Sequence, residues 1–208
     1  MEKTDNKIMK IAVTALMAAL CFIAFSYLQI PIPLPGGDQV ALHVGNAFCV
    51  LAALLMGGLY GGLAGSIGMT LADLLNPAYV TSAPKTFILK MCIGLIAGLI
   101  AHKMGRINES SDTKHVFFWT LIACLGSLGF NVIFDPVFGY FYKTFILGVQ
   151  TDVAKIVSTW AAGVTAINAA VCTVVVTALY MVLRPALKKS GLMTRFLPSA
   201  KKPDSDKI

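Results

Sequence analysis

Long apolar segments, separated by short polar or proline-rich stretches, make up most of this chain. The apolar segments that predict helices cover residues 7–30, 41–56, 59–75, 85–102, 116–133 and 156–183. Their lengths are close to the roughly 20 residues that a helix needs to cross the hydrocarbon core of a bilayer. The pattern therefore predicts an all-α, polytopic membrane protein with six transmembrane helices.

Prolines mark where the first and third helices are predicted to end. Pro31, Pro33 and Pro35 follow the first apolar segment, and a proline lacks the amide hydrogen that a helix needs. Asn76 and Pro77 follow the third segment in the same way. We therefore expect external loops after these two helices.

Two further stretches are harder to place. Residues 135–155 are aromatic and apolar, but Pro136 and two glycines interrupt them, so we predict an external loop or a partial helix there. The chain ends in the polar sequence KKPDSDKI, which has too few apolar residues to fold by itself. We predict one transmembrane domain over residues 1–190 and a flexible cytoplasmic tail over residues 191–208.

Glycines recur at a spacing of four residues from the junction of the second and third apolar segments into the third segment, and again in the fourth. The pairs are Gly57/Gly61, Gly58/Gly62, Gly61/Gly65 and Gly94/Gly98. This spacing exposes bare backbone on one helix face and lets neighbouring membrane helices approach closely. A phosphate-binding loop is the alternative, but no GK[ST] and no GxGxxG sequence occurs. We expect a tight antiparallel hairpin around the sequence MGGLYGG.

Composition and charge agree with a membrane protein. Of the 208 residues, 57% are hydrophobic and 13% are charged, so the chain is far more apolar than an ordinary soluble domain. The formal net charge of +7 comes from cations at the chain ends and in one loop, not along an aromatic face, which argues against nucleic acid as a partner. The same asymmetry predicts that both termini are cytoplasmic. The five cysteines lie inside apolar runs without metal-like spacing, and the sequence predicts no metal and no cofactor.

Polar residues in and beside the apolar segments are predicted to meet at the external side, with Asn168 closest to the middle of the membrane. A charged side chain inside a membrane is costly unless it is paired or faces water, so such residues usually mark a site. The candidates are His43, Asn46, Asp73, Tyr79, Lys85, Lys90, Asn131, Asp135, Trp160 and Asn168. We predict that they outline one outward-facing cavity that binds a substrate.

Several of these candidates have an alternative, structural role that the sequence leaves open. His43 would cap the second helix. Asp73 and Lys90 fall at similar depths on adjacent helices and would form an ion pair. Asn46 and Asn168 would form interhelical hydrogen bonds.

Two other features are open in the same way. Ala15 and Ala19 form a stripe of small residues near the cytoplasmic end of the first helix, which either receives a helix of another protein or packs within the bundle. Trp160 either stacks on a ligand or belongs to the aromatic belt at the membrane surface.

The sequence HVGNAFCVLAALLMGGLYGGLAG, followed by LADLL and PKTFILK, resembles the substrate-binding S components of energy-coupling factor (ECF) vitamin transporters. The size, the six predicted spans and the Ala15 and Ala19 stripe fit the same family. The resemblance covers nearly the whole chain apart from the tail. Within this family, the glycine-rich hairpin with LADLL and PKTFILK is similar to the branch that binds riboflavin and hydroxymethylpyrimidine-like compounds.

The resemblance implies a subunit, not an enzyme, that captures a small heteroaromatic vitamin or precursor at the outer face of a prokaryotic plasma membrane. Pyridoxine-like, hydroxymethylpyrimidine-like and riboflavin ligands are all compatible with it. It also implies a transmembrane coupling subunit that docks on Ala15 and Ala19. Two cytoplasmic ATPase subunits would supply the energy, because this chain has no Walker sequence.

Two other functions are the alternatives. An intramembrane lipid-modifying enzyme would need paired carboxylates, a metal-binding His/Glu set or a nucleophile with a base. The apolar segments contain no HExxH, GxSxG or DxxxD sequence. A secondary transporter that works alone would usually show two repeated halves, and the sequence shows none.

Overall fold

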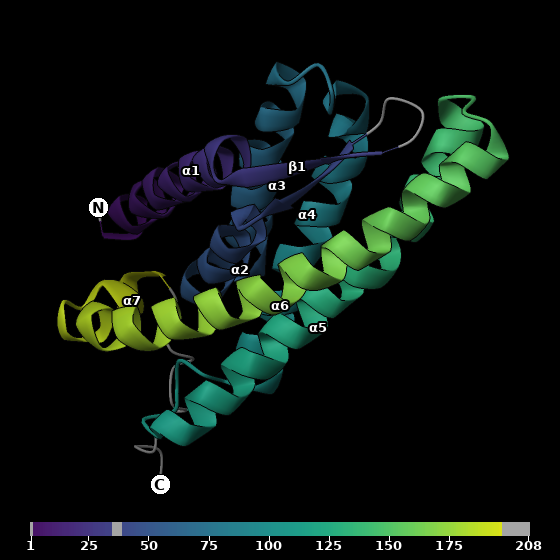
Figure 1. Ribbon diagram of the computed structural model, residues 1–208. Coiled ribbons are helices and arrows are strands. Elements are labelled where there is room, and N and C mark those ends of the chain that lie inside the picture. The colour runs from purple at the N-terminus through teal and green to yellow at the C-terminus, as the bar shows by residue number, and fades with distance from the viewer. Residues whose placement is uncertain (1, 35–38, 197–208) are drawn as a thin grey trace, which may run out of the picture.

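The computed structural model describes residues 2–34 and 39–196, and six main helices dominate it (Figure 1). These helices are α1 (Glu2–Tyr27), α2 (Gly45–Met56), α3 (Gly58–Leu75), α4 (Ala83–Gly98), α5 (Thr113–Phe141) and α6 (Thr151–Lys189). The shorter elements are β1 (Gln29–Pro33), β2 (Gln39–His43), the 3₁₀ turn η1 (Val80–Ser82), the π-helical turns η2 (Leu99–Met104) and η3 (Tyr142–Ile146), and α7 (Leu192–Phe196). The prediction of a helical fold with six main helices is confirmed.

Four helical segments are long and apolar enough to cross a membrane: Asn6–Tyr27, Val80–Met104, Thr113–Ile146 and Thr151–Lys189. The other two main helices are shorter or less apolar. α2 has 12 residues and extends only about 18 Å, whereas the hydrocarbon core is about 30 Å thick. The glycines of α3 and its Asp73 reduce the hydropathy of that helix.

α2 lies at the centre of the bundle. All of its residues except Phe48 are buried, and it packs against α1, α3, α4 and α6. α5 and α6 run side by side as a long hairpin along one side of the molecule (Figure 1). The short α2 is therefore shielded from lipid by its neighbours.

Glycines bring α2, α3 and α4 into backbone contact. A Cβ atom at Gly94 would overlap the backbone of Gly62, and one at Gly61 would overlap Ala53 of α2. α2 and α3 are joined only by Gly57, whose φ of 95° favours glycine. The predicted close packing and the tight hairpin are confirmed.

We expect Gly94→Ala to lower the melting temperature of the protein in detergent. The added methyl group would push α3 and α4 apart, and overpacking of this kind costs about 1–3 kcal/mol or more. Gly129→Ala in α5 is the control, because a Cβ atom there meets nothing within 4 Å. Alanine is roughly 1 kcal/mol better than glycine in a helix, so the control should be at least as stable as the wild type. A Gly94→Ala variant as stable as Gly129→Ala would contradict the packing argument.

The prediction is wrong for the segment between the first two helices. α1 ends at Tyr27 rather than at residue 30, and β1 pairs antiparallel with β2. Pro31 and Pro33 lie within β1 instead of directly after the helix, because a proline is tolerated on the open edge of a two-stranded ribbon. The second helix consequently begins at Gly45 rather than at residue 41.

The stretch 135–155 is mostly helical rather than a loop. α5 continues through Pro136 to Phe141, η3 follows, and α6 begins at Thr151. α6 also continues beyond the predicted end at residue 183, through Pro185. A proline removes one backbone hydrogen bond, and a helix can continue when its neighbours support it. Each proline is therefore inside a helix rather than at its end.

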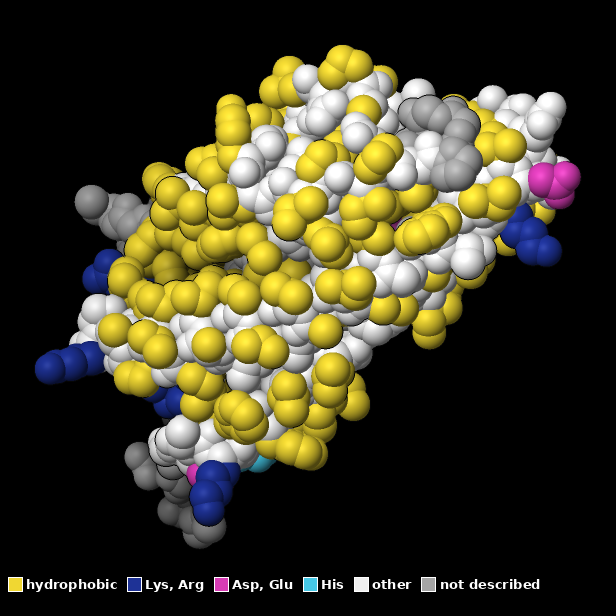
Figure 2. Space-filling model, viewed as in Figure 1, with side chains coloured by type: hydrophobic (Ala, Val, Ile, Leu, Met, Phe, Trp, Pro, Cys, Tyr) yellow, Lys and Arg dark blue, Asp and Glu magenta, His cyan; other side chains and the backbone are white. Residues whose placement is uncertain are grey.

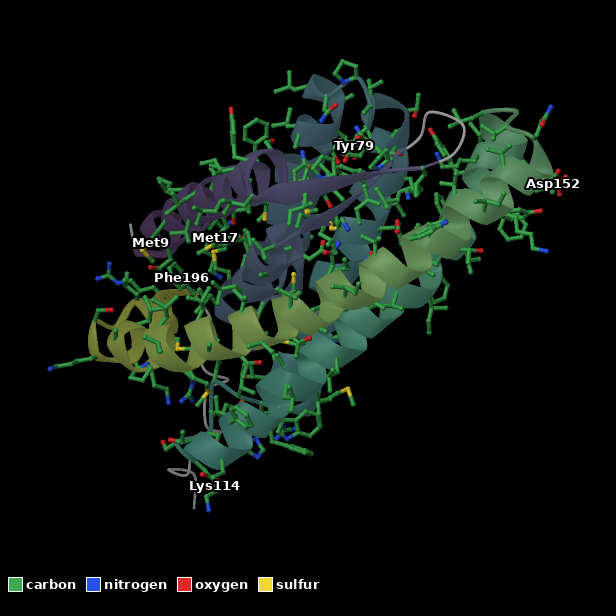
Figure 3. The ribbon with its side chains drawn as sticks, in the orientation of Figure 1. Met9, Met17, Tyr79, Lys114, Asp152 and Phe196 are labelled. Carbon is green, nitrogen blue, oxygen red and sulfur yellow. The ribbon has the colours of Figure 1, made fainter. Side chains whose placement is uncertain are left out.

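Basic side chains gather at one end of the molecule (Figure 2). The start of α1, the start of α5 and α7 lie at this end, which we name the basic end, and the turn between α5 and α6 lies at the opposite end (Figure 1). α7 forms the first part of the predicted tail, and its Met193 and Phe196 are buried. Figure 3 shows Phe196 near Met9 and Met17 of α1. The rest of the predicted tail, 197–208, lies outside the described residues.

Candidate functional site

A polar cavity lies between β2 and the helices, away from the basic end. Its walls come from the ends of α1 and α3, the start of α4 and the central parts of α5 and α6. Nine of the ten predicted residues line it: His43, Asn46, Asp73, Tyr79, Lys85, Lys90, Asn131, Asp135 and Asn168. The fold thus brings together polar residues from seven separate elements and connections, and Tyr79 marks one wall in Figure 3.

Trp160 does not line the cavity. Its side chain is 54% exposed, whereas the next residue, Ala161, faces the cavity. Successive residues on a helix point about 100° apart, so Trp160 faces the surroundings of the protein. This is the placement of an aromatic belt residue.

An ion pair that the sequence did not reveal bridges α4 and α5 at the cavity. The Nζ atom of Lys85 lies 2.8 Å from Oδ1 of Asp135, and the hydroxyl of Thr165 donates to Oδ2 of Asp135 at 3.1 Å. Among the described residues this is the only ion pair within 4 Å. Asp73 and Lys90, whose ion pair the sequence left open, do not come within 4 Å of each other, because equal depth on two helices does not fix the directions of their side chains.

We expect Lys85→Met alone to lower the free energy of unfolding by about 1.5–3 kcal/mol, because it leaves the half-buried Asp135 carboxylate without the ammonium group that donates to it at 2.8 Å. The double change Lys85→Met with Asp135→Asn should cost less than the single change, since it leaves no unpaired charge. Chemical unfolding of the single and double variants would measure the coupling. Additive losses would show that the two side chains do not act as a pair.

Three buried oxygen atoms in the cavity lining have no hydrogen-bond partner within the described part of the chain. They are Oδ1 of Asn46, Oδ2 of Asp73 and Oδ1 of Asn131, and each of these residues is only 2% exposed. Leaving a buried polar atom unpaired costs about 1–3 kcal/mol, so nearly all such atoms in folded proteins have a partner. Three acceptors around one cavity are suited to a ligand that donates N–H or O–H groups.

Asn168 fixes the position of β2. Its Nδ2 donates to the carbonyl oxygen of Ala41 at 2.9 Å, and its Oδ1 accepts from the backbone N–H of His43 at 3.0 Å. Both functions of the amide are therefore used within the protein. The sequence left open whether Asn168 contacts a substrate or forms a structural hydrogen bond between helices. These contacts are structural hydrogen bonds, but they join α6 to the strand β2 rather than to another helix.

His43 is the last residue of β2. The prediction that it lies in the first turn of the second helix is therefore wrong. Burial, and then the nearby Lys90 ammonium, lower the pKa of His43 to about 3, so the ring is neutral at physiological pH. The backbone N–H of Gly45 donates to its Nδ1 at 3.2 Å, which leaves the ring proton on Nε2. The Phe25 ring packs edge-on against the His43 ring, with 4.7 Å between the ring centroids. It also packs against the Tyr79 ring, with 5.6 Å between the centroids. One wall of the cavity is therefore aromatic and uncharged.

The sequence reasoning missed Phe25 and Thr165, which both line the cavity. Nothing in the sequence separates Phe25 from the other apolar residues of the first helix. Thr165 lies three residues before Asn168 and therefore shares its helix face, a spacing that could have identified it.

Ala15 and Ala19 are exposed and line an apolar groove between α1 and α3, separate from the polar cavity. This groove, the α1–α3 groove, has a volume of about 630 Å³, and its larger side chains include Ile11, Phe22, Leu63, Ile67 and Leu71. The alanines therefore do not pack against another helix among the described residues. They leave a recess at the surface of the bundle.

Comparisons with known proteins point to one family. Residues 5–185 match the family model described as "ECF-type riboflavin transporter, S component". Among solved structures, the chain is similar to one described under "Structure and mechanism of the S component of a bacterial ECF transporter", with a TM-score of 0.58 and 18% sequence identity. That similarity covers 88% of this chain and 99% of the other, and at this identity it supports the fold alone. No curated protein matches the chain significantly.

Proposed function

Because the chain belongs to the family of ECF-type riboflavin transporter S components, we propose that its polar cavity binds a flat, heteroaromatic vitamin or vitamin precursor. The family consists of membrane-embedded substrate-capture subunits, and several apolar helices of this chain are long enough to span the cell membrane. The protein itself would bind and carry its substrate without changing it chemically. The family is one of transporter substrate-binding components rather than of enzymes, which supports this proposal over the lipid-modifying enzyme that the sequence left as an alternative.

The three unpartnered acceptors of Asn46, Asp73 and Asn131 carry this proposal. A vitamin with ring N–H and side-chain O–H groups would supply the missing donors. The described residues of the lining include two carboxylates and two ammonium groups, those of Asp73, Asp135, Lys85 and Lys90, and an uncharged ligand fits the balance of these charges. The aromatic wall beside Phe25 suits a planar ring.

The size of the ligand is less narrowly defined. Riboflavin is our first candidate because the family carries its name. The cavity has a volume of about 110 Å³, below the range of roughly 300–1,000 Å³ that is usual for ligand pockets. A three-ring ligand would therefore require the cavity walls to move further apart than a single-ring ligand would. Pyridoxine-like and hydroxymethylpyrimidine-like compounds are the other candidates.

Calorimetric titration of the purified protein tests the proposal. Riboflavin, pyridoxine and hydroxymethylpyrimidine would be titrated in parallel, and we expect one of them to bind at one site with submicromolar affinity. The bound vitamin should also raise the melting temperature, because a ligand that binds only the folded state stabilises it. If none of the three bound, the proposed substrate class would be wrong.

We further propose that the basic end faces the cytoplasm and that both termini lie there. Lysine and arginine are enriched in cytoplasmic segments of membrane proteins, and they gather at this end (Figure 2). The cavity would then open toward the outside. A transmembrane coupling subunit would dock in the α1–α3 groove, and two ATPase subunits would drive release of the vitamin.

A further inference from the structure

A second apolar groove opens between α5 and α6, in the half of the hairpin that lies toward the basic end. Its walls include Phe117 and Leu121 from α5, and Val174, Thr177, Ala178 and Met181 from α6. We name it the α5–α6 groove. It has a volume of about 490 Å³, and none of its residues lines the polar cavity or the α1–α3 groove. Phe117 and Val174 are 47% and 70% exposed, so the groove faces the surroundings of the helices, which in a membrane are lipid chains.

Lysines continue both walls of this groove toward the basic end. Lys114 precedes Phe117 by three residues and Leu121 by seven, and Lys188 follows Met181 by seven. Residues three, four or seven apart share one face of a helix, so each lysine lies on the groove side of its helix. Both lysines are exposed, and Figure 3 shows Lys114 at the extreme end of α5. An apolar groove thus ends between two cations.

The loop between α4 and α5 lies at the basic end of the groove, where it binds two cationic side chains of α6 and contributes two acidic residues of its own. The Lys188 ammonium and the Arg184 guanidinium both donate to the carbonyl oxygen of Ser110, at 3.2 and 2.7 Å. The Asp112 carboxylate caps α5 by accepting from the backbone N–H of Lys114 at 2.9 Å, and Glu109 is exposed in the same loop. The Lys188 side chain is therefore anchored on the loop that leads into α5 and Lys114, and the Asp112 carboxylate already serves as a helix cap.

We propose that the α5–α6 groove binds an anionic phospholipid of the cytoplasmic leaflet. One acyl chain would lie against the apolar walls, and the phosphate would lie between the ammonium groups of Lys114 and Lys188. Basic pockets between membrane helices on the cytoplasmic side are a recurring form of lipid headgroup site. This inference requires that the basic end is cytoplasmic, but it does not depend on which vitamin the polar cavity binds.

The same charges argue against a second copy of the chain as the occupant. A two-fold contact between copies brings the same surface of each together, so it would place Lys114 and Lys188 of one copy near those of the other. Like charges at such a contact oppose association. A phospholipid instead has an anionic phosphate that fits beside the lysines and an apolar chain that fits against the apolar walls.

Native mass spectrometry of the protein released from mixed-lipid nanodiscs tests the proposal. The nanodiscs would contain equal amounts of phosphatidylglycerol and phosphatidylethanolamine with identical acyl chains. We expect the wild type to retain phosphatidylglycerol in preference. The double variant Lys114→Gln with Lys188→Gln should retain it about 25-fold less, since each of the two lysines beside the phosphate contributes roughly a fivefold factor. The control Lys7→Gln with Lys103→Gln removes the same charge at the same end, away from the groove, and should behave like the wild type.

Ala178→Trp fills the groove without changing its charge, and we expect it to abolish the preference for phosphatidylglycerol. Val174→Trp is a second blocking variant at a more exposed position, in case the first does not fold. Equal retention of the two lipids by the wild type would overturn the proposal. So would loss of the preference in the Lys7 and Lys103 control, retention of it in a folded blocking variant, or a protein dimer in place of the lipid adduct.

Discussion

In the Asn131→Leu variant we expect the affinity for the vitamin to fall about 10- to 100-fold, while the empty protein remains at least as stable as the wild type. The Oδ1 atom of Asn131 is buried without a partner among the described residues, so its removal breaks no hydrogen bond of that oxygen in the empty protein. In the complex, a ligand donor would lose its acceptor, which costs about 1–3 kcal/mol. A change of 1.4 kcal/mol is tenfold in affinity.

Asn168→Leu is the matched control, because it is the same substitution in the lining of the same cavity. Asn168 already makes two hydrogen bonds to β2, so we expect this variant to lose stability whether or not the vitamin is present. Thermal unfolding of the empty proteins and calorimetric titration would measure both effects. If Asn131→Leu destabilised the empty protein as much as Asn168→Leu did, Asn131 would be a structural residue and not a ligand contact.

The second large effect is expected at the α1–α3 groove. Ala15→Trp or Ala19→Trp should abolish complex formation with the coupling subunit, because only small side chains leave room for a helix from another protein. Both alanines lie at the surface of this groove and away from the polar cavity. Vitamin binding by the solitary protein should therefore be unchanged.

Co-purification of the coupling subunit with the tagged protein would measure complex formation. Leu16→Trp is the control, because Leu16 is 57% exposed on the same helix but does not line the groove. It should leave the complex intact. A complex that formed normally with tryptophan at position 15 or 19 would place the docking surface elsewhere.

The main helices could be predicted from the sequence because each consists largely of a continuous apolar segment. The glycine spacing also predicted that neighbouring helices approach closely, since a missing side chain has the same consequence wherever two helices meet, and the structure shows this contact between α3 and α4. The ends of the elements were less predictable. β1 contains two prolines, and Pro136 and Pro185 lie inside helices, so the effect of each proline depends on neighbours that the sequence does not show.

The candidate site was predictable in its membership but not in its pairing. Nine of the ten predicted residues line the cavity, because polar side chains in apolar segments are few and their depth follows from the topology. Which of them contact each other depends on side-chain direction. Lys85 pairs with Asp135 across residues 50 apart in the sequence, and no local pattern indicates that contact.

Mass spectrometry of the small molecules released from the protein after purification from cells tests the capture function most directly. A high-affinity capture subunit should retain its substrate through purification, so we predict a flat heteroaromatic vitamin or precursor in nearly equimolar amount. The same preparation of Asn131→Leu should release much less of it, although any phospholipid in the α5–α6 groove should remain. Release of phospholipid alone from the wild type, with no heteroaromatic compound, would contradict vitamin capture.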